Sequence, residues 1–254
     1  MPKRKAAGLT LLEALVILVV VIFLLALVIM YLPRGREQPR RVHCANNLKQ
    51  LAMATIAHAV NHRQYPGYRN RLEPSERCAG WIVTMLPYVE RQELYTAWSE
   101  AGEADPPAPD IYDFICPSAA REHSIGTALC SYIGNAGRAD RDELTAGIFF
   151  DHCLPADERI AMTLDYIAEH DGTDRTLLLT ERRTPYNWSE LSPEKTTVGF
   201  VWYADAPPAE PAYPSSYHVG GFNVIYADGH GEFLSSEIDD RVYQQLMTTH
   251  TPAE

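Results

Sequence analysis

The chain has few basic side chains beyond residue 41. Residues 1–41 hold seven Lys or Arg against Glu13 and Glu37, whereas the rest of the chain holds 15 basic and 31 acidic residues, a balance of -16. Nucleic-acid binding needs a cationic surface that displaces counterions from phosphates, so the composition argues against a nucleic-acid partner. With 46% hydrophobic and 22% charged residues, the chain is not intrinsically disordered and has enough apolar residues for one head domain.

Signatures of common enzymes and zinc sites are also missing. No serine lies in a G-x-S-x-G context, no glycine-rich loop could cradle a phosphate, and no C-x-x-C pair gives the usual zinc spacing. We therefore assign no catalytic residue and no metal ligand from the sequence.

The odd number of cysteines leaves at least one thiol without a partner in the same chain. The five cysteines are Cys44, Cys78, Cys116, Cys130 and Cys153. In an exported domain, up to two disulfides are expected, and their pairing stays open.

A long uncharged segment dominates the N-terminal part. Ala14 to Leu32 is a run of 19 residues without a formal charge. As a helix it would be about 28 Å long, enough to span the hydrocarbon core of a bilayer. A secretory signal has a shorter apolar region that ends in small residues. A buried core helix is the other alternative, but it is usually shorter and lacks flanking basic clusters such as those at residues 3–5 and 34–41. We predict a transmembrane helix, whose orientation the flanking charges do not decide.

The residues before this run form a distinctive pattern. Lys3-Arg4-Lys5-Ala6-Ala7-Gly8 is followed by Leu9-Thr10-Leu11-Leu12-Glu13 and then by the apolar run. This order resembles the class III prepilin signal of type IV pilins and type II secretion pseudopilins. The resemblance implies that a prepilin peptidase cleaves between Gly8 and Leu9 and methylates the new amino terminus. Leu9 stands where these proteins usually have Phe, and Glu13 would become the fifth residue of the mature chain.

Glu13 is a carboxylate at the start of a predicted membrane span. Such a charge costs roughly 3 kcal/mol, so it normally has a partner. The resemblance implies that the partner is the amino group of Leu9 in a neighbouring subunit during filament assembly, and residues 9 and 13 also share a helical face. The alternative is that Glu13 lies at the level of the lipid headgroups and extends toward water.

Beyond the apolar run, the sequence predicts a hinge followed by helices. Proline and glycine residues predict a basic hinge over residues 33–41. Apolar residues at spacings of three and four predict a helix from residue 48 to 60, with His58 and His62 on its solvated face. A second helix is predicted from about residue 87 to 95.

The C-terminal part reads as β-rich. Short apolar runs predict strands at residues 147–150, 176–179 and 198–203. The clearest prediction is a hairpin, with strands at 222–227 and 230–234 joined by Asp228-Gly229, because glycine tolerates the positive φ of a two-residue turn.

An H-x9-D-G motif links His218 to this turn at Asp228-Gly229. Further segments occur in order along the chain: Cys44–Leu51, Leu86–Glu90 with Leu94-Tyr95, Phe114–Ser118, Ser131–Asn135 and Asp171–Glu181. Together they resemble, nearly end to end, a bacterial family of pilin-like proteins with a domain of unknown function, abundant in planctomycetes. The resemblance suggests a shared structural role for Cys44 and Cys116.

This resemblance implies an α+β, pilin-like fold with an N-terminal transmembrane helix and a head of helices packed on an antiparallel β-sheet. The expected parts are a prepilin leader at 1–8, a transmembrane and assembly helix at 9–32, the hinge at 33–41 and an extracytoplasmic head at 42–254.

The H-x9-D-G motif has two readings. His218, Asp228 and His230 could form a metal or acid–base site. We favour a structural role, in which His218 holds the turn at Asp228-Gly229 and Asp228 accepts local backbone hydrogen bonds.

A second acidic cluster, Asp165, Glu169, Asp171 and Asp174, could bind calcium. It fails the EF-hand pattern because Gly172 follows Asp171 directly, so we favour a simple turn at Asp171-Gly172. Major pseudopilins similar to this chain can bind calcium in the head. Calcium therefore stays an open cofactor without assigned ligands.

The expected function is a non-enzymatic pilin-like or pseudopilin-like subunit of a pilus or secretion pseudopilus. Its expected partners are the membrane, prepilin peptidase, and copies of itself or other pilin-like subunits. It would be a single-pass protein of the inner membrane, with the head in the periplasm or at the cell surface. The alternative is a membrane-tethered binding or hydrolytic domain that uses a prepilin-type anchor.

Overall fold

The computed structural model describes residues 10–31, 34–102, 106–119, 128–137, 147–189 and 215–249. The chain forms two compact units, Met1–Pro39 and Arg40–Glu254. The predicted cleavage site at Gly8 and Leu9 and the predicted strand at 198–203 lie outside the described residues.

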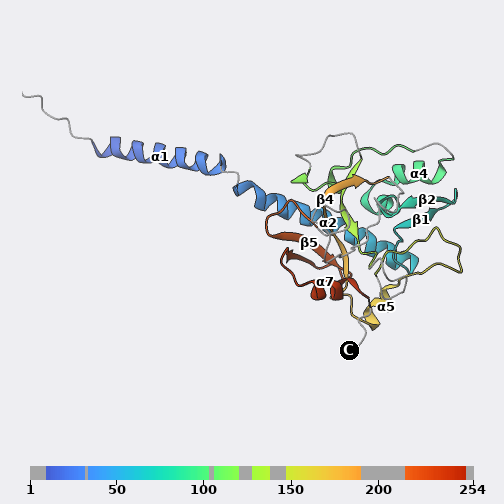
Figure 1. The fold of residues 1–254 in the computed structure, drawn as a ribbon. Coiled ribbons are helices and arrows are strands. Elements are labelled where there is room, and N and C mark those ends of the chain that lie inside the picture. Colours follow the sequence, from blue (N-terminus) through green and yellow to red (C-terminus); the bar gives the residue numbers. More distant parts are fainter. Residues whose placement is uncertain are drawn as a thin grey trace, which may run out of the picture. The chain divides into compact units, whose positions relative to one another are not determined.

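The first unit contains helix α1, Leu11–Tyr31 (Figure 1). The helix begins with a capping box in which Thr10 and Glu13 bond each other. The backbone N and Oγ1 of Thr10 each donate to Glu13 Oε2 at 2.8 Å, and Glu13 N donates to Thr10 Oγ1 at 3.3 Å. The large apolar side chains from Leu11 to Leu27 are exposed. Within the part of the chain that the structure describes, no helix was found that is long and apolar enough to cross a membrane.

Helix α2, Arg34–His62, includes most residues of the predicted hinge, so the interruption of the helix expected from Gly35 and Pro39 does not occur. Pro39 lies in the second turn of α2. There its missing N–H deprives only the Gly35 carbonyl of a helical hydrogen bond, a cost that the helix tolerates near its start. The boundary between the two units falls directly after Pro39.

The apolar stripe of α2 forms its buried face, as the periodicity predicts. Leu48, Leu51 and Ala52 are at most 1% exposed, whereas Val60, at the end of the stripe, is 62% exposed. The expectation of two solvated histidines is wrong for His58, which is 7% exposed and stacks on His62 with ring centroids 4.2 Å apart. Burial of the imidazole lowers the pKa of His58 to about 4.

Two antiparallel sheets make up the strand content of the described residues. A two-stranded sheet pairs β1, Arg69–Leu72, with β2, Arg77–Gly80. A four-stranded sheet has the order β3-β4-β5-β6, and all its neighbours are antiparallel. Its strands are Leu129–Gly134, Leu177–Asn187, Gly221–Tyr226 and Gly231–Ser235. The α+β class with antiparallel sheets is therefore confirmed.

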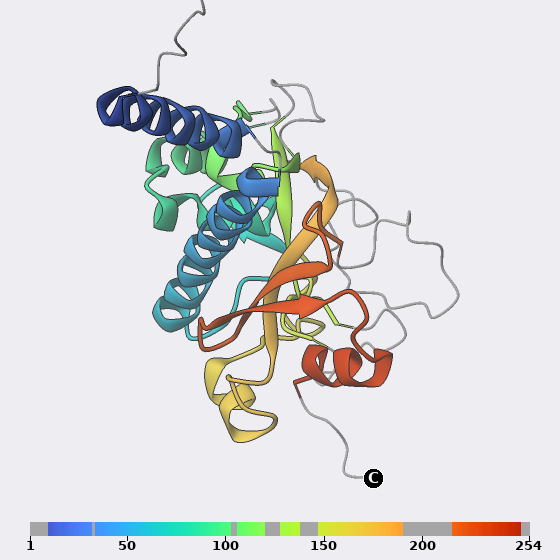
Figure 2. The same ribbon diagram turned by 90° about the vertical axis from the view of Figure 1, so that its left-hand side faces the viewer.

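The four-stranded sheet carries a core on each face, because successive side chains of a strand point to opposite sides. Leu178 and Ile225 belong to the larger core, together with Leu48 of α2. Val224 belongs to a smaller core that includes Tyr243 of α7, Asp240–Met247. Figure 2 shows α2 and α7 on different sides of the strands.

Short helices complete the described part of the head. They are α3 (Trp81–Met85), η1 (Leu86–Val89), α4 (Gln92–Glu100), η2 (Tyr112–Phe114) and α5 (Leu164–Glu169). The predicted helix at 87–95 is divided between η1 and α4, because Glu90 adopts a left-handed conformation with φ 60°. Residues 147–150 form no strand, although Ile148 and Phe149 are buried.

The C-terminal hairpin is confirmed as β5 and β6, with Gly221 paired to Ser235 and Ile225 paired to Gly231. Gly229 has φ +86°, the left-handed conformation that the Asp-Gly turn requires. The predicted strand at 176–179 is confirmed as the first part of β4.

Candidate functional site

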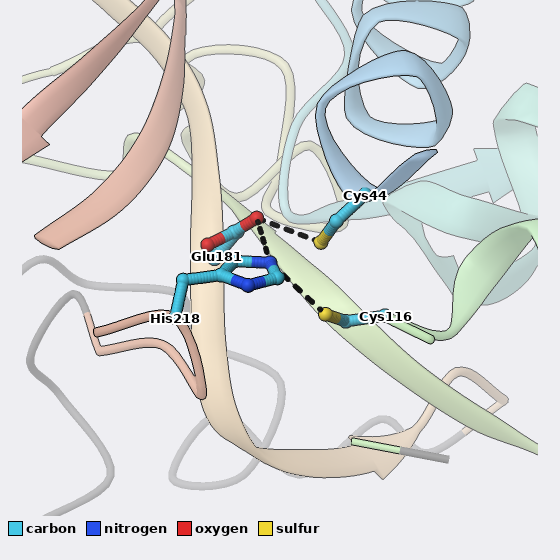
Figure 3. A group of neighbouring side chains, drawn as sticks. All are labelled: Cys44, Cys116, Glu181 and His218. Carbon is cyan, nitrogen blue, oxygen red and sulfur yellow. Dashed lines mark hydrogen bonds and ion pairs between the residues drawn. The ribbon is translucent and has the colours of Figure 1, made fainter. Parts of the chain in front are cut away.

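Four side chains from distant parts of the chain meet in the interior of the head (Figure 3). They are Cys44, Cys116, Glu181 and His218, and one potential ligand atom from each lies within 4.8 Å of those of the other three. The residues are 0%, 4%, 1% and 5% exposed, respectively. We refer to them as the four-residue cluster.

Helix α2 and strand β4 supply the first two members. Cys44 precedes Leu48 by four residues and Leu51 by seven, so helical periodicity places it on the buried face of α2. Glu181 lies on β4 beside Asn223 of β5. The Asn223 side chain donates from Nδ2 to Glu181 Oε1 at 2.6 Å, and its backbone N donates to Oε2 at 3.2 Å. These bonds fix the orientation of the carboxylate.

Two loop segments supply the other members. Cys116 follows η2 and begins a turn, in which the backbone N–H groups of Ser118 and Ala119 bond its sulfur. His218 precedes β5, and its backbone N donates to Ser216 Oγ at 3.1 Å. The imidazole therefore reaches the cluster from the loop at the start of β5, on the opposite side from Cys44 in Figure 3.

Close contacts connect the four groups. Cys44 Sγ donates to Glu181 Oε1 at 2.7 Å. His218 Nε2 lies 3.6 Å from the same oxygen and 3.5 Å from Cys116 Sγ. The hydroxyl of Tyr132, on β3, donates to Cys44 Sγ at 3.4 Å.

Burial and hydrogen bonding divide the two thiols into different states. Burial raises the pKa of Cys44, so this thiol keeps its proton and acts as a donor. Hydrogen bonds, first from Cys44 and then from His218 and the backbone of Ser118 and Ala119, lower the pKa of Cys116 to about 5 despite its burial. The two thiols therefore differ in acidity, although both are buried.

The donor set of two sulfurs, one imidazole nitrogen and one carboxylate oxygen suits three kinds of chemistry. A cysteine beside a histidine resembles a nucleophile and its base. However, the side chains of His218 and Glu181 are only 1% and 2% exposed, so a substrate would reach them only if the surrounding segments separated. Two adjacent thiols can also form a disulfide, and four such ligands can bind a metal.

The structure pairs two of the five cysteines elsewhere. Cys78 and Cys153 form a disulfide with Cα atoms 6.0 Å apart. The disulfide joins β2 to the segment that follows Asp151. Asp151 itself forms a 3.1 Å ion pair with Arg69 of β1. Cys44, Cys116 and Cys130 are buried free thiols.

The H-x9-D-G motif is divided between two places. Asp228 Oδ1 accepts from the backbone N of His230 at 2.9 Å and contacts its ring Nδ1 at 2.6 Å. Through these two contacts with His230, Asp228 stabilises the turn. The expected role of His218 in that turn is wrong, because its ring lies in the four-residue cluster, beside Cys116.

The segment Asp171-Gly172 forms a turn after α5. Gly172 has φ +90°, and its N donates to Ile167 O at 2.9 Å. Asp171 Oδ2 accepts from Thr248 Oγ1 at 3.4 Å. In the described part of the chain, Asp171 does not combine with Asp165, Glu169 and Asp174 into a group that could hold a metal ion.

No sequence pattern marks Glu181 as a site residue, and none brings the four cluster members together. Each member does lie in or beside one of the ordered segments that support the family resemblance. Cys44 begins the first segment, Cys116 lies within another, and Glu181 ends the one that includes β4. The available signal was therefore a polar or sulfur-containing residue in each segment, which the fold then gathers at one point.

A known family matches a region of the chain that includes all of these segments. The sequence model of a family described as "Protein of unknown function (DUF1559)" matches residues 33–207 and 201–241, which is more than half of the chain. The matched residues begin after the apolar run. No curated protein and no solved structure matches the chain. The chain belongs to the DUF1559 family.

Proposed function

We propose that the protein is a non-enzymatic pilin-like or pseudopilin-like subunit, which prepilin peptidase cleaves between Gly8 and Leu9. Residues 9–32 would anchor it in the inner membrane and pack against copies of itself or other pilin-like subunits. The observation that carries the proposal is the N-terminal order of a basic cluster, Gly8, Glu13 and a run of 19 uncharged residues.

The start of α1 supports cleavage at this position. The helix begins at Leu11, and Thr10 caps it, so the mature chain would place only Leu9 before the capping box. The new amino group would belong to Leu9, one residue before this cap. The amino group of a neighbouring subunit would then meet the Glu13 carboxylate, which Thr10 of the same chain as Glu13 already orients.

The disulfide supports a head outside the cytoplasm. Structural disulfides persist in oxidising compartments and are rare in the cytosol. Cys78 and Cys153 are joined although 75 positions separate them in the sequence. The periplasm or the cell surface provides the conditions for this bond.

The processing step is tested with Gly8→Leu and a matched control, Ala6→Leu, each expressed in the native host. We expect Gly8→Leu to accumulate as a precursor that retains Met1, whereas Ala6→Leu begins at Leu9. The measurement is intact mass and N-terminal sequencing of protein from membranes. A Gly8→Leu protein that begins at Leu9 would contradict the proposal, as would wild-type protein that still carries residues 1–8.

The assembly step is tested by separating the charge of Glu13 from its capping bonds. Glu13→Gln removes the charge but keeps a side chain that can complete a capping box, whereas Thr10→Ala removes the cap and keeps the charge. We expect Glu13→Gln to lose crosslinked oligomers in membranes and Thr10→Ala to retain them. Equal oligomer yields in wild type and Glu13→Gln would argue against assembly through this carboxylate.

The alternative function, a tethered binding domain, has one structural observation in its favour. A groove of about 880 Å³ lies along α2 and is lined in part by Asn46, Lys49 and Arg91. Three results together would favour the tethered binding domain over the structural subunit. Glu13→Gln would leave the oligomers unchanged, the wild type would bind a ligand saturably, and Lys49→Ala would abolish that binding.

A further inference from the structure

We propose that Cys44, Cys116, Glu181 and His218 bind one zinc ion, which joins four segments of the head. This site is independent of the proposed role in assembly. It assigns a specific chemistry to His218 of the H-x9-D-G motif and to one residue in each of three other family segments.

The donor set favours zinc. Zinc binds thiolate sulfur, imidazole nitrogen and carboxylate oxygen, and its structural sites contain four protein ligands. Calcium and magnesium take oxygen ligands, so two sulfur donors disfavour both. Thiolates together with imidazole select zinc among the common divalent cations of proteins.

The distances suit a tetrahedral site. Ligand bonds of about 2.3 Å to sulfur and about 2.0–2.1 Å to nitrogen or oxygen give ligand–ligand separations of roughly 3.3–3.8 Å. The observed separations from His218 Nε2 are 3.5 Å to Cys116 Sγ and 3.6 Å to Glu181 Oε1. Cys44 Sγ lies closer, at 2.7 Å from Glu181 Oε1, to which its thiol donates a hydrogen bond. Zinc would replace the thiol proton, and the two atoms would move apart by about 0.8 Å.

The groups around the cluster donate to its ligand atoms. Asn223 donates to both oxygens of Glu181, and the hydroxyl of Tyr132 donates to Cys44 Sγ. Backbone N–H groups bond the sulfur of Cys116. Such donors orient metal ligands and stabilise their anionic forms.

The site is closed, which indicates a structural role for the metal. All four ligands come from the protein and all four are buried, so no position is left for water or a substrate. The ion would join α2, the turn after η2, β4 and the loop before β5. Because the unfolded chain has no preformed site, zinc binding would contribute to the stability of the head.

The main competing arrangement is a disulfide between Cys44 and Cys116. The experiment therefore measures metal and thiols in the same sample of full-length protein, purified from membranes in detergent without chelators. We expect one zinc per chain by inductively coupled plasma mass spectrometry. After denaturation with a chelator, alkylation and peptide mapping should find Cys44, Cys116 and Cys130 as thiols.

Matched variants locate the metal. Cys116→Ser and His218→Ala should lower the zinc content from one per chain to near zero, whereas Cys130→Ser and His230→Ala should retain it. Cobalt added to the metal-free wild type should produce the visible absorption of a tetrahedral, thiolate-ligated site.

Chelation of the wild type covers the case in which the cluster variants do not fold. Removing the metal should lower the Tm, and zinc, but not calcium, should restore it. A wild type that contains no zinc and does not take up added zinc would overturn the proposal. A Cys44–Cys116 disulfide in the purified protein would overturn it as well, and so would zinc retained in a folded His218→Ala protein.

Discussion

Replacing Asn135 by alanine should destabilise the head more than a typical single substitution does. Its side chain is 0% exposed and makes three hydrogen bonds. Nδ2 donates to the carbonyls of Leu177 at 2.7 Å and Met247 at 2.6 Å, and Oδ1 accepts from Gly137 N at 2.9 Å. One amide thus connects β4, the end of α7 and the segment after β3.

The expected loss follows from these three bonds. A buried hydrogen bond contributes about 1 kcal/mol, and a buried group left without its partner costs about 1–3 kcal/mol. Asn135→Ala removes all three bonds at once, so we expect the free energy of unfolding to fall by about 3–5 kcal/mol. That is a large fraction of the roughly 5–15 kcal/mol by which native domains are stable.

The assay is urea unfolding of the processed protein in detergent, followed by tryptophan fluorescence, since Trp81, Trp98 and Trp188 are at most 3% exposed. The control is Asn61→Ala. Asn61 is exposed and its side chain donates to Tyr88 at 3.4 Å, so its loss should change stability by less than about 0.5 kcal/mol. If Asn135→Ala costs less than about 1 kcal/mol, the reasoning from buried hydrogen bonds is refuted.

Three further outcomes are expected. Gly229→Ala and Gly220→Ala both place a side chain at positive φ, near +86° and +89°, but only the first brings it against α2. Each should cost about 1–2 kcal/mol in urea unfolding, with the larger loss at Gly229, and equal losses would show that the α2 contact contributes nothing. Asn223→Ala should weaken zinc binding about 10- to 100-fold in competition with a colorimetric chelator, and unchanged affinity would exclude its orienting role. Diamide should link Cys44 to Cys116 only after zinc is removed, as seen by peptide mapping; equally fast linkage in the zinc-loaded protein would contradict protection by the metal.

Local sequence patterns predicted the elements whose structure depends on nearby residues. The C-terminal hairpin needed only two apolar runs and the Asp228-Gly229 turn, and β5 and β6 are confirmed there. The helical stripe from Leu48 was likewise confirmed as the buried face of α2. In both places, the periodicity of side-chain burial and the local turn chemistry agree, so no distant contact is needed to predict the element.

Predictions failed where one local signal was weighed without its position in the fold. Pro39 predicts a break in the helix, but a proline in the second turn removes only one hydrogen bond and α2 continues. The polarity of His58 predicts a place on the solvated face, although the fold covers that position. The run at 147–150 is apolar because Ile148 and Phe149 enter the core from a loop, and periodicity does not separate this case from a strand.

The four-residue cluster could not be derived from spacing. Zinc motifs that sequence reveals have ligands in close pairs, whereas here each ligand comes from a different element. Only the pairing of β3, β4 and β5 and the packing of α2 against them bring the four atoms together. The sequence could identify the segments as a related set, but tertiary structure decides which side chain of each segment points inward.

The fold also explains why nine residues separate the two ends of the H-x9-D-G motif. Strand β5, Gly221–Tyr226, occupies most of the interval between His218 and Asp228. At one end, His218 meets Cys44 of α2 through the cluster, and at the other, a Cβ added to Gly229 would lie 3.2 Å from Met53 Sδ of the same helix. The nine-residue spacing therefore corresponds to the length of a strand that is held against α2 at both ends. Because an inserted residue in β5 also moves every later side chain to the other face of the sheet, it could not preserve both contacts. The motif thus combines two separate structural roles. Asp228 and Gly229 form the turn, and only His218 faces the proposed metal.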